Sequence, residues 1–110
     1  MYYFIAFYSD KDIILEDNII DKCIFLDESY KIIDNFSARK NHDTIYFDYL
    51  ITDKSEILKE LGAEFDNNCV LINYDFQTSL ENTFAFSKVT TSSLDEKMQI
   101  KKILNYIFEN

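Results

Sequence analysis

Residues 44–51 of the chain read Thr-Ile-Tyr-Phe-Asp-Tyr-Leu-Ile, and this stretch decides the fold. Apolar residues recur here at every second position: Ile45, Phe47, Tyr49 and Ile51 alternate with Tyr46, Asp48 and Leu50. The period of two predicts a β-strand with one face against a hydrophobic core. The chain therefore contains a sheet, and the remaining segments are interpreted by how they could pack against it.

The other strand candidates are short apolar runs bounded by polar residues. Tyr2–Tyr8 is aromatic and predicts a buried strand. Cys23–Leu26 and Tyr30–Ile33 are separated by three polar residues and predict a hairpin. Two more strands are predicted at Cys69–Tyr74 and Thr83–Val89. Residues 12–36 as a whole fit helix or sheet spacing, so the secondary structure of this part stays open.

Two segments have helical spacing. In the first, Asp53 and Glu56 have the form of a capping box, and Gly62 is placed to end the helix. Its apolar stripe comprises Ile57, Leu58, Leu61 and Phe65. In the second, Ser93 and Glu96 form a capping box before a longer stripe. That stripe comprises Leu94, Ile100, Ile103, Leu104, Ile107 and Phe108.

These elements predict one α+β domain over residues 1–110: an antiparallel sheet of about five strands packed against a C-terminal amphipathic helix, with a second short helix. The chain has a single glycine and no proline. Turns must then use Asn and Asp, which tolerate a left-handed backbone. The turn candidates are Asp17-Asn18, Asn41-His42-Asp43 and Asp66-Asn67-Asn68.

Composition points to a soluble protein of the cytoplasm. Apolar residues make up 47% of the 110 residues, enough for a core, yet no run approaches the length of a membrane span. The first residues carry no basic segment and no small-residue cleavage site, so no secretory signal is expected. Cys23 and Cys69 lie in apolar runs and are expected to be reduced thiols rather than a disulfide.

The residues needed for common catalytic and cofactor chemistry are missing. One glycine cannot form a phosphate-binding loop, and Cys23, Cys69 and His42 lack the paired spacing of a zinc site. We therefore expect no cofactor, no metal and no enzymatic activity. A cysteine-dependent enzyme built from Cys23 or Cys69 with His42 and Asp43 is the alternative ranked last.

Charge is the most unusual feature of the sequence. The net charge is −9, and the segment from Asp43 to Glu81 contains nine acidic residues but only two lysines. Such a surface repels nucleic acid and anionic membranes and attracts a basic protein. The predicted partner-binding residues are Asp48, Asp53, Glu56, Glu60, Glu64 and Asp66. The alternative for each of these acids is a solvated side chain that only keeps the protein soluble.

In size, acidity and aromatic-rich composition the whole chain resembles the immunity proteins that bacteria carry beside polymorphic or contact-dependent growth-inhibition toxins. The resemblance implies a cytoplasmic inhibitor that binds its cognate toxin domain, with acidic side chains facing a basic nuclease cleft. Two alternatives stay open. One is a phage-encoded nucleic-acid mimic that blocks a host defence nuclease, and the other is a structural or assembly subunit of unknown oligomeric state.

Overall fold

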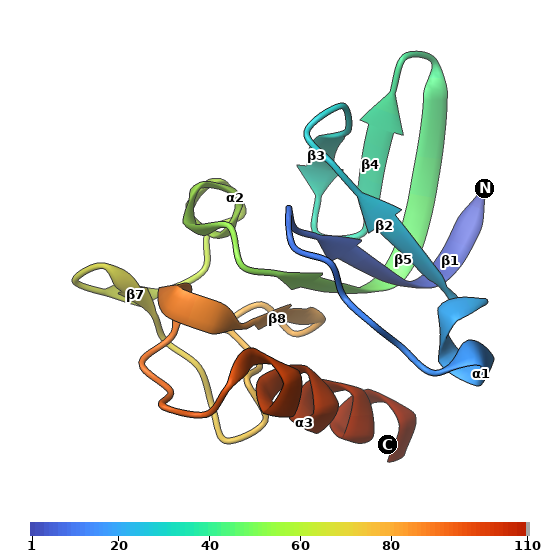
Figure 1. Cartoon of the computed structure of the whole chain (residues 1–110). Helices are drawn as coiled ribbons and strands as arrows, with labels where there is room; N and C mark the ends of the chain where they lie inside the picture. Colours follow the sequence, from blue (N-terminus) through green and yellow to red (C-terminus); the bar gives the residue numbers. More distant parts are fainter. Residues whose placement is uncertain (110) are drawn as a thin grey trace.

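The core of the molecule is a mixed sheet flanked by the C-terminal helix (Figure 1). The computed structural model describes residues 1–109. Its elements are β1 (Tyr2–Tyr8), α1 (Asp17–Ile20), β2 (Cys23–Leu26), β3 (Lys31–Asp34), β4 (Ser37–Lys40), β5 (Asp43–Thr52), α2 (Ser55–Glu60), β6 (Phe65–Asp66), β7 (Cys69–Val70), β8 (Thr83–Ala85), the 3₁₀ turn η1 (Ser87–Val89) and α3 (Glu96–Glu109). The predicted α+β class, the C-terminal helix and the second short helix are confirmed.

Strand direction differs from the predicted antiparallel sheet. The strand order is β2-β1-β5-β4-β3, and β8 pairs with the second half of β5. β1 runs parallel to both β2 and β5, and β8 runs parallel to β5. Within this sheet the antiparallel pairs are β3 with β4 and β4 with the first half of β5. β6 and β7 form a separate two-stranded antiparallel sheet. The long connection from β1 through α1 permits the parallel pairing, because it returns the chain to the end of the sheet where β1 began.

The predicted hairpin of Cys23–Leu26 with Tyr30–Ile33 is wrong, although strands occur at both places. β2 pairs with β1 at one edge of the sheet, and β3 pairs with β4 at the other edge. The two strands are joined by a tight turn in which the Tyr30 N–H donates to the Asp27 carbonyl at 3.1 Å. Since a short turn links opposite edges, the sheet must curl until these edges approach each other.

The curled sheet has a core on each face, and β1 contributes to both. Ile5 and Phe7 pack in the layer that α3 covers with Ile103, Leu104 and Ile107. Ala6 and Tyr8 lie inside the curl, where the cluster also includes Leu26, Ile32 and Ala38. A strand buried on both faces needs an unbroken apolar run, which accounts for the composition of Tyr2–Tyr8.

The predicted alternation along residues 44–51 holds only for the first half of β5. Ile45 and Phe47 lie inside the curl, but Tyr49 and Ile51 pack in the layer under α3. β1, the strand beside β5, shows the same shift: Phe4 and Ile5 are consecutive residues that pack on the same side of the sheet. At this point the N–H groups of Phe4 and Ile5 both donate to the Lys22 carbonyl, at 3.0 and 3.2 Å. A local irregularity shared by the two central strands therefore shifts the alternation.

The segment after β5 forms a smaller third cluster. Leu58 of α2 and Val70 of β7 pack there with Ala85 and Val89. The strands predicted at Cys69–Tyr74 and Thr83–Val89 are shorter than expected, because β7 ends at Val70 and β8 ends at Ala85.

Two of the three predicted turns are confirmed by their backbone conformation. Asn41 and Asn67 have φ values of 56° and 58°, the left-handed conformation that glycine otherwise supplies. Asp17-Asn18 is not a turn, because it begins α1. An acidic residue in the first turn of a helix also interacts favourably with the helix dipole, so Asp17 suits either structure.

Both predicted capping boxes are wrong, although both helices exist. α2 begins after Lys54, whose side chain makes no cap hydrogen bond. In α3 the Asp95 carboxylate accepts the Met98 N–H at 2.8 Å, so Asp95 caps the helix instead of Ser93. The predicted end of α2 is confirmed. Gly62 has φ 91°, and the Ala63 N–H donates to the Leu58 carbonyl at 2.9 Å in a Schellman-type turn.

Within residues 1–109, no helix combines the length and the apolar character that crossing a bilayer requires. Cys23 and Cys69 are both free thiols, as the sequence predicted; Cys23 is buried and Cys69 is partly exposed.

Gly62→Ala should destabilise the protein by about 1–2 kcal/mol, because an L-residue with a Cβ disfavours the left-handed backbone. No atom lies within 4 Å of the position that a Cβ would take, so the loss would come from the backbone alone. Gly62→Asn, the matched control, should lose less. Urea unfolding of both variants tests this, and equal stability of the alanine variant and the parent would contradict it.

Candidate functional site

An acidic cleft lies at the carboxyl ends of the parallel strands. β1, β2 and β5 run in the same direction, and each is followed within two residues by an acid: Asp10, Glu28 and Asp53. Parallel strands bring the residues after their carboxyl ends to one edge of a sheet. In Figure 1, β1 and β5 both run toward the side where α2 lies. The three acids line a cleft of about 410 Å³ together with Lys54, Ser55 and Glu56. We call this the carboxyl-end cleft.

Lys54 holds two of these acids together. Its Nζ lies 3.0 Å from Asp10 Oδ2 and 3.7 Å from Glu28 Oε1, and 4.9 Å from the centre of the Tyr8 ring. Partial burial disfavours the ammonium, but the hydrogen bond to Asp10 and the nearby negative charge outweigh it and raise the pKa of Lys54. The cleft is lined by four carboxylates and one lysine, so it keeps a net negative charge.

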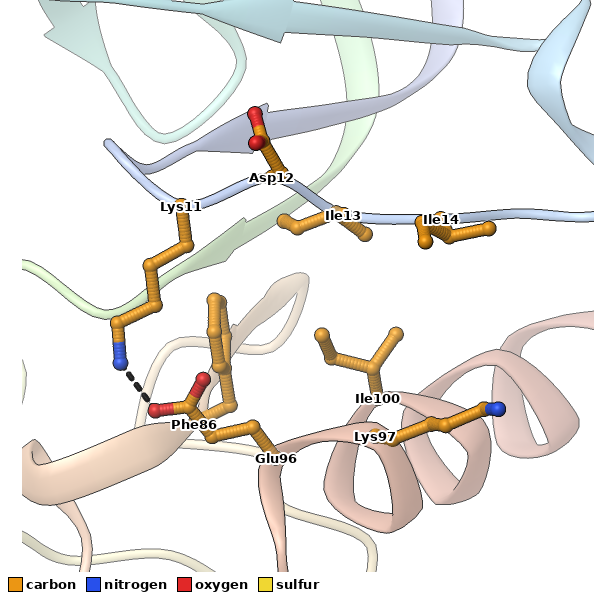
Figure 2. A pocket seen from close by; sticks show the side chains of 8 residues that line it. All are labelled: Lys11, Asp12, Ile13, Ile14, Phe86, Glu96, Lys97 and Ile100. Carbon is orange, nitrogen blue, oxygen red and sulfur yellow. Dashed lines mark hydrogen bonds and ion pairs between the residues drawn. The ribbon is translucent and has the colours of Figure 1, made fainter.

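Lys11 connects the same edge of the sheet to α3. Its Nζ lies 2.7 Å from Ser87 Oγ and 3.9 Å from Asp53 Oδ2, and it also pairs with Glu96 (Figure 2). Lys11 and then Ser87 stabilise the ionised carboxylate by hydrogen bonds, which lowers the pKa of Glu96. Asp53 Oδ1 is buried and has no hydrogen-bond partner in the part of the chain that the structure describes. Asp53 is thus only partly neutralised.

A second hollow lies beside this ion pair. It has a volume of about 280 Å³ and separates the segment after β1 from α3 (Figure 2). Ile13 and Ile14 line it from one side, and Phe86 and Ile100 line it from the other. Ile14 is 93% exposed. The hollow is mainly apolar and is therefore distinct in character from the carboxyl-end cleft.

The structure separates the predicted partner-binding residues into three places. Asp53 and Glu56 line the carboxyl-end cleft. Glu60, Glu64 and Asp66 are exposed at the end of α2, in the loop after it and on β6. Asp48 lies roughly 16 Å back along β5 from Asp53, in another groove.

Sequence reasoning missed Asp10 and Glu28. Each follows an apolar strand closely, which is a readable signal, but their convergence depends on the parallel direction of β1 and β2.

Ser87 and Lys11 superficially resemble a serine–lysine catalytic pair. Ser87 has φ 72° at the start of η1, and its Oγ is within hydrogen-bond distance of the amine. The Lys11 amine is already engaged, because it forms ion pairs with Glu96 and Asp53. The Ser87 N–H is also used, because it donates to Gln99 Oε1 at 2.7 Å. The arrangement therefore acts as a structural anchor between η1, α3 and the segment after β1.

The structure does not assemble the cysteine-dependent site. Burial raises the pKa of the Cys23 thiol to about 11, and its Sγ lies 3.3 Å from the Ile19 carbonyl oxygen. His42 is exposed in the turn between β4 and β5, and none of the hydrogen bonds within residues 1–109 joins it to a thiol. No three His, Cys, Asp or Glu side chains in this range are arranged to hold a metal ion.

Comparison with known proteins assigns no family to the chain. No protein-family model matches it, and neither a curated protein nor a solved structure shows significant similarity to it. The functional argument therefore rests on the geometry and charge of the sites.

Glu96→Gln should destabilise the protein at neutral pH but not in acid. Because the folded protein lowers the pKa of Glu96 below its ordinary value of 4.5, the ionised carboxylate stabilises the fold above that pH. This contribution disappears as the pH falls through the folded pKa. Urea unfolding at pH 7 and at a series of lower pH values should show a difference between parent and variant that shrinks as the pH falls. Glu60→Gln, at an exposed position on α2, is the control and should change little at any of these pH values.

The native protein should expose one reactive thiol. Cys69 is partly exposed, whereas Cys23 is buried and has a raised pKa, so a thiol reagent should titrate Cys69 first and both residues in denaturant. A Cys69→Ser variant should react only after unfolding. Rapid reaction of that variant under native conditions would contradict the burial of Cys23.

Proposed function

We propose that the chain is a non-enzymatic inhibitor that docks its carboxyl-end cleft on a basic protein domain, as an immunity protein does on a nuclease-type toxin. One observation carries the proposal. Acids from three separate parts of the sequence, Asp10, Glu28 and the pair Asp53 and Glu56, converge on one concave surface. Their convergence concentrates negative charge beyond what the net charge of −9 would produce on an even surface.

The negative charge of this cleft would affect both the rate at which a basic partner associates and the stability of the complex. A concentrated negative surface attracts a basic partner over distance and raises the association rate, an effect that salt weakens. Isolated exposed ion pairs contribute only about 0–1 kcal/mol each, so one acid by itself would do little. A partner that covers the whole cleft removes water from several carboxylates at once, and pairing each with a cation then fixes the register of docking.

Lys11 and Lys54 hold the acids of the cleft in a fixed arrangement before a partner binds. They bridge Asp10, Glu28, Asp53 and Glu96, and so hold carboxylates from different segments in place before any partner arrives. Preorganised groups lose less conformational entropy on binding than mobile ones. The remaining negative charge is still available to arginine and lysine side chains of the partner.

The test uses the protein encoded by the reading frame next to the gene for this chain, with its association rate measured at two salt concentrations. Glu28→Lys with Glu56→Lys should slow association at low salt by at least about tenfold, because both substitutions reverse charge in the cleft. The matched control is Asp21→Lys with Asp43→Lys. These exposed acids lie at the amino ends of β2 and β5 and do not line the cleft, so the control makes the same change in net charge away from it.

Equal slowing in both double variants would mean that only net charge matters, and would contradict docking at the cleft. Absence of a complex at either salt concentration would contradict the toxin-immunity proposal itself. Inhibition of several unrelated basic nucleases by the parent chain would instead support the nucleic-acid mimic. A stable closed oligomer without a partner would support the assembly subunit.

A further inference from the structure

A third groove, away from the carboxyl-end cleft and the apolar hollow, combines aromatic walls with two acids that form no ion pair within residues 1–109. It has a volume of about 370 Å³ and lies where β1, β5, α3 and two loops meet. Its aromatic residues are Phe4, Phe36, Tyr49 and Tyr106, and its acids are Asp48 and Glu81. We call it the aromatic groove. It shares no lining residue with the carboxyl-end cleft.

The aromatic walls are held in place by ring contacts. Phe4 meets Tyr49 edge to face with ring centres 5.3 Å apart. Phe84 lies beneath the groove and contacts Tyr49 at 6.1 Å and Tyr106 at 5.7 Å between ring centres. Because Phe84 is fully buried, these contacts fix two of the rings that face the groove against the core. Phe36, by contrast, is half exposed at the rim.

Hydrogen bonds position the two acids. Asn82 is buried, and its Nδ2 donates to the Asp48 carbonyl at 2.9 Å and to the Asn35 carbonyl at 2.6 Å. Asn82 thus ties the turn that carries Phe36 to the strand that carries Asp48. Gln77 Nε2 donates to the Glu81 carbonyl and fixes the loop that carries Glu81. The Asp48 carboxylate accepts a hydrogen bond from the Tyr2 hydroxyl.

No cation of the chain neutralises this groove within the described residues. The four ion pairs found in residues 1–109 all involve Lys11 or Lys54, and neither Asp48 nor Glu81 takes part in them. Five lysines lie over aromatic rings elsewhere, at 3.7–5.3 Å from the ring centres. None of these five contacts uses Phe4, Phe36 or Tyr49.

We propose that the aromatic groove binds an arginine side chain of a protein partner. A guanidinium is planar, so it can stack on aromatic rings while its edge donates hydrogen bonds to carboxylates. The groove supplies both partners, because aromatic rings and the two acids Asp48 and Glu81 line it together. An ammonium of lysine would gain the charge interaction but not the planar stacking. This inference goes beyond the proposed function, because it adds a second binding surface and names arginine as the side chain that this surface binds.

The test uses the full chain labelled with ¹⁵N and titrated with N-acetyl-arginine amide while amide chemical shifts are recorded. Saturable shifts should appear at Phe4, Tyr49, Glu81 and Asn82. N-acetyl-citrulline amide has nearly the same shape without the charge and should cause no comparable shifts. Tetramethylammonium, a cation without planarity, should bind more weakly than the arginine probe.

Variants then assign the contacts. Asp48→Asn with Glu81→Gln should weaken binding of the arginine probe at least about fivefold, since both charges in the groove are removed. Phe36→Leu should weaken it by a smaller factor, and its exposed position makes it tolerable for the fold. The control, Asp21→Asn with Asp43→Asn, removes the same charge elsewhere and should leave binding unchanged. The spectrum of each variant reports whether it is folded.

Equal shifts with citrulline, binding of tetramethylammonium as tight as that of arginine, or unchanged binding in the Asp48 and Glu81 variant would overturn the proposal. Failure here is distinguishable from failure of the proposed function. Glu28→Lys with Glu56→Lys alters the other surface and should leave arginine binding in the groove intact. The association-rate test at the carboxyl-end cleft can succeed or fail independently of this titration.

Discussion

The parallel pairing of β1 between β2 and β5 is the constraint on which the rest of the structure depends. It buries both faces of β1 from Ile5 to Tyr8, with Ile5 and Phe7 toward α3 and Ala6 and Tyr8 inside the curled sheet. Because the three strands share one direction, the polar residues that follow them meet at one edge. The hydrophobic arrangement therefore decides where the charged surface forms.

At that edge, lysine contacts hold in place carboxylates that would otherwise repel one another. Four carboxylates in the carboxyl-end cleft would repel one another, and Lys54 offsets part of this by contacting Asp10 and Glu28. Lys11 does the same for Asp53 and Glu96 while anchoring α3. Two lysines are enough to organise the acids and too few to neutralise them. The proposed docking on a basic protein draws on both properties, because steering requires residual charge and specificity requires order.

Local signals predicted the elements that local interactions stabilise. The amphipathic stripe of α3, the end of α2 at Gly62 and the left-handed turns at Asn41 and Asn67 all follow from spacing or from backbone sterics. The capping box of α3 was wrong because neighbouring polar residues can compete for the cap: Asp95 accepts the hydrogen bond while Glu96 pairs with Lys11. At α2 the cap position falls to Lys54, which makes no side-chain hydrogen bond there, rather than to Asp53. The hairpin was wrong because two apolar runs joined by a turn do not reveal which strands they pair with.

The sequence by itself determined the α+β class, the two helices, the free thiols and an excess of acid in the middle of the chain, since periodicity, composition and charge are local properties. Only the tertiary structure decided strand direction, the change of face within β5 and the grouping of the acids. It brought Asp10 and Glu28 to Asp53 and Glu56, and it left Asp48 in an aromatic groove with Glu81. Those groupings depend on pairings between strands far apart in sequence, and no local pattern encodes such a partner.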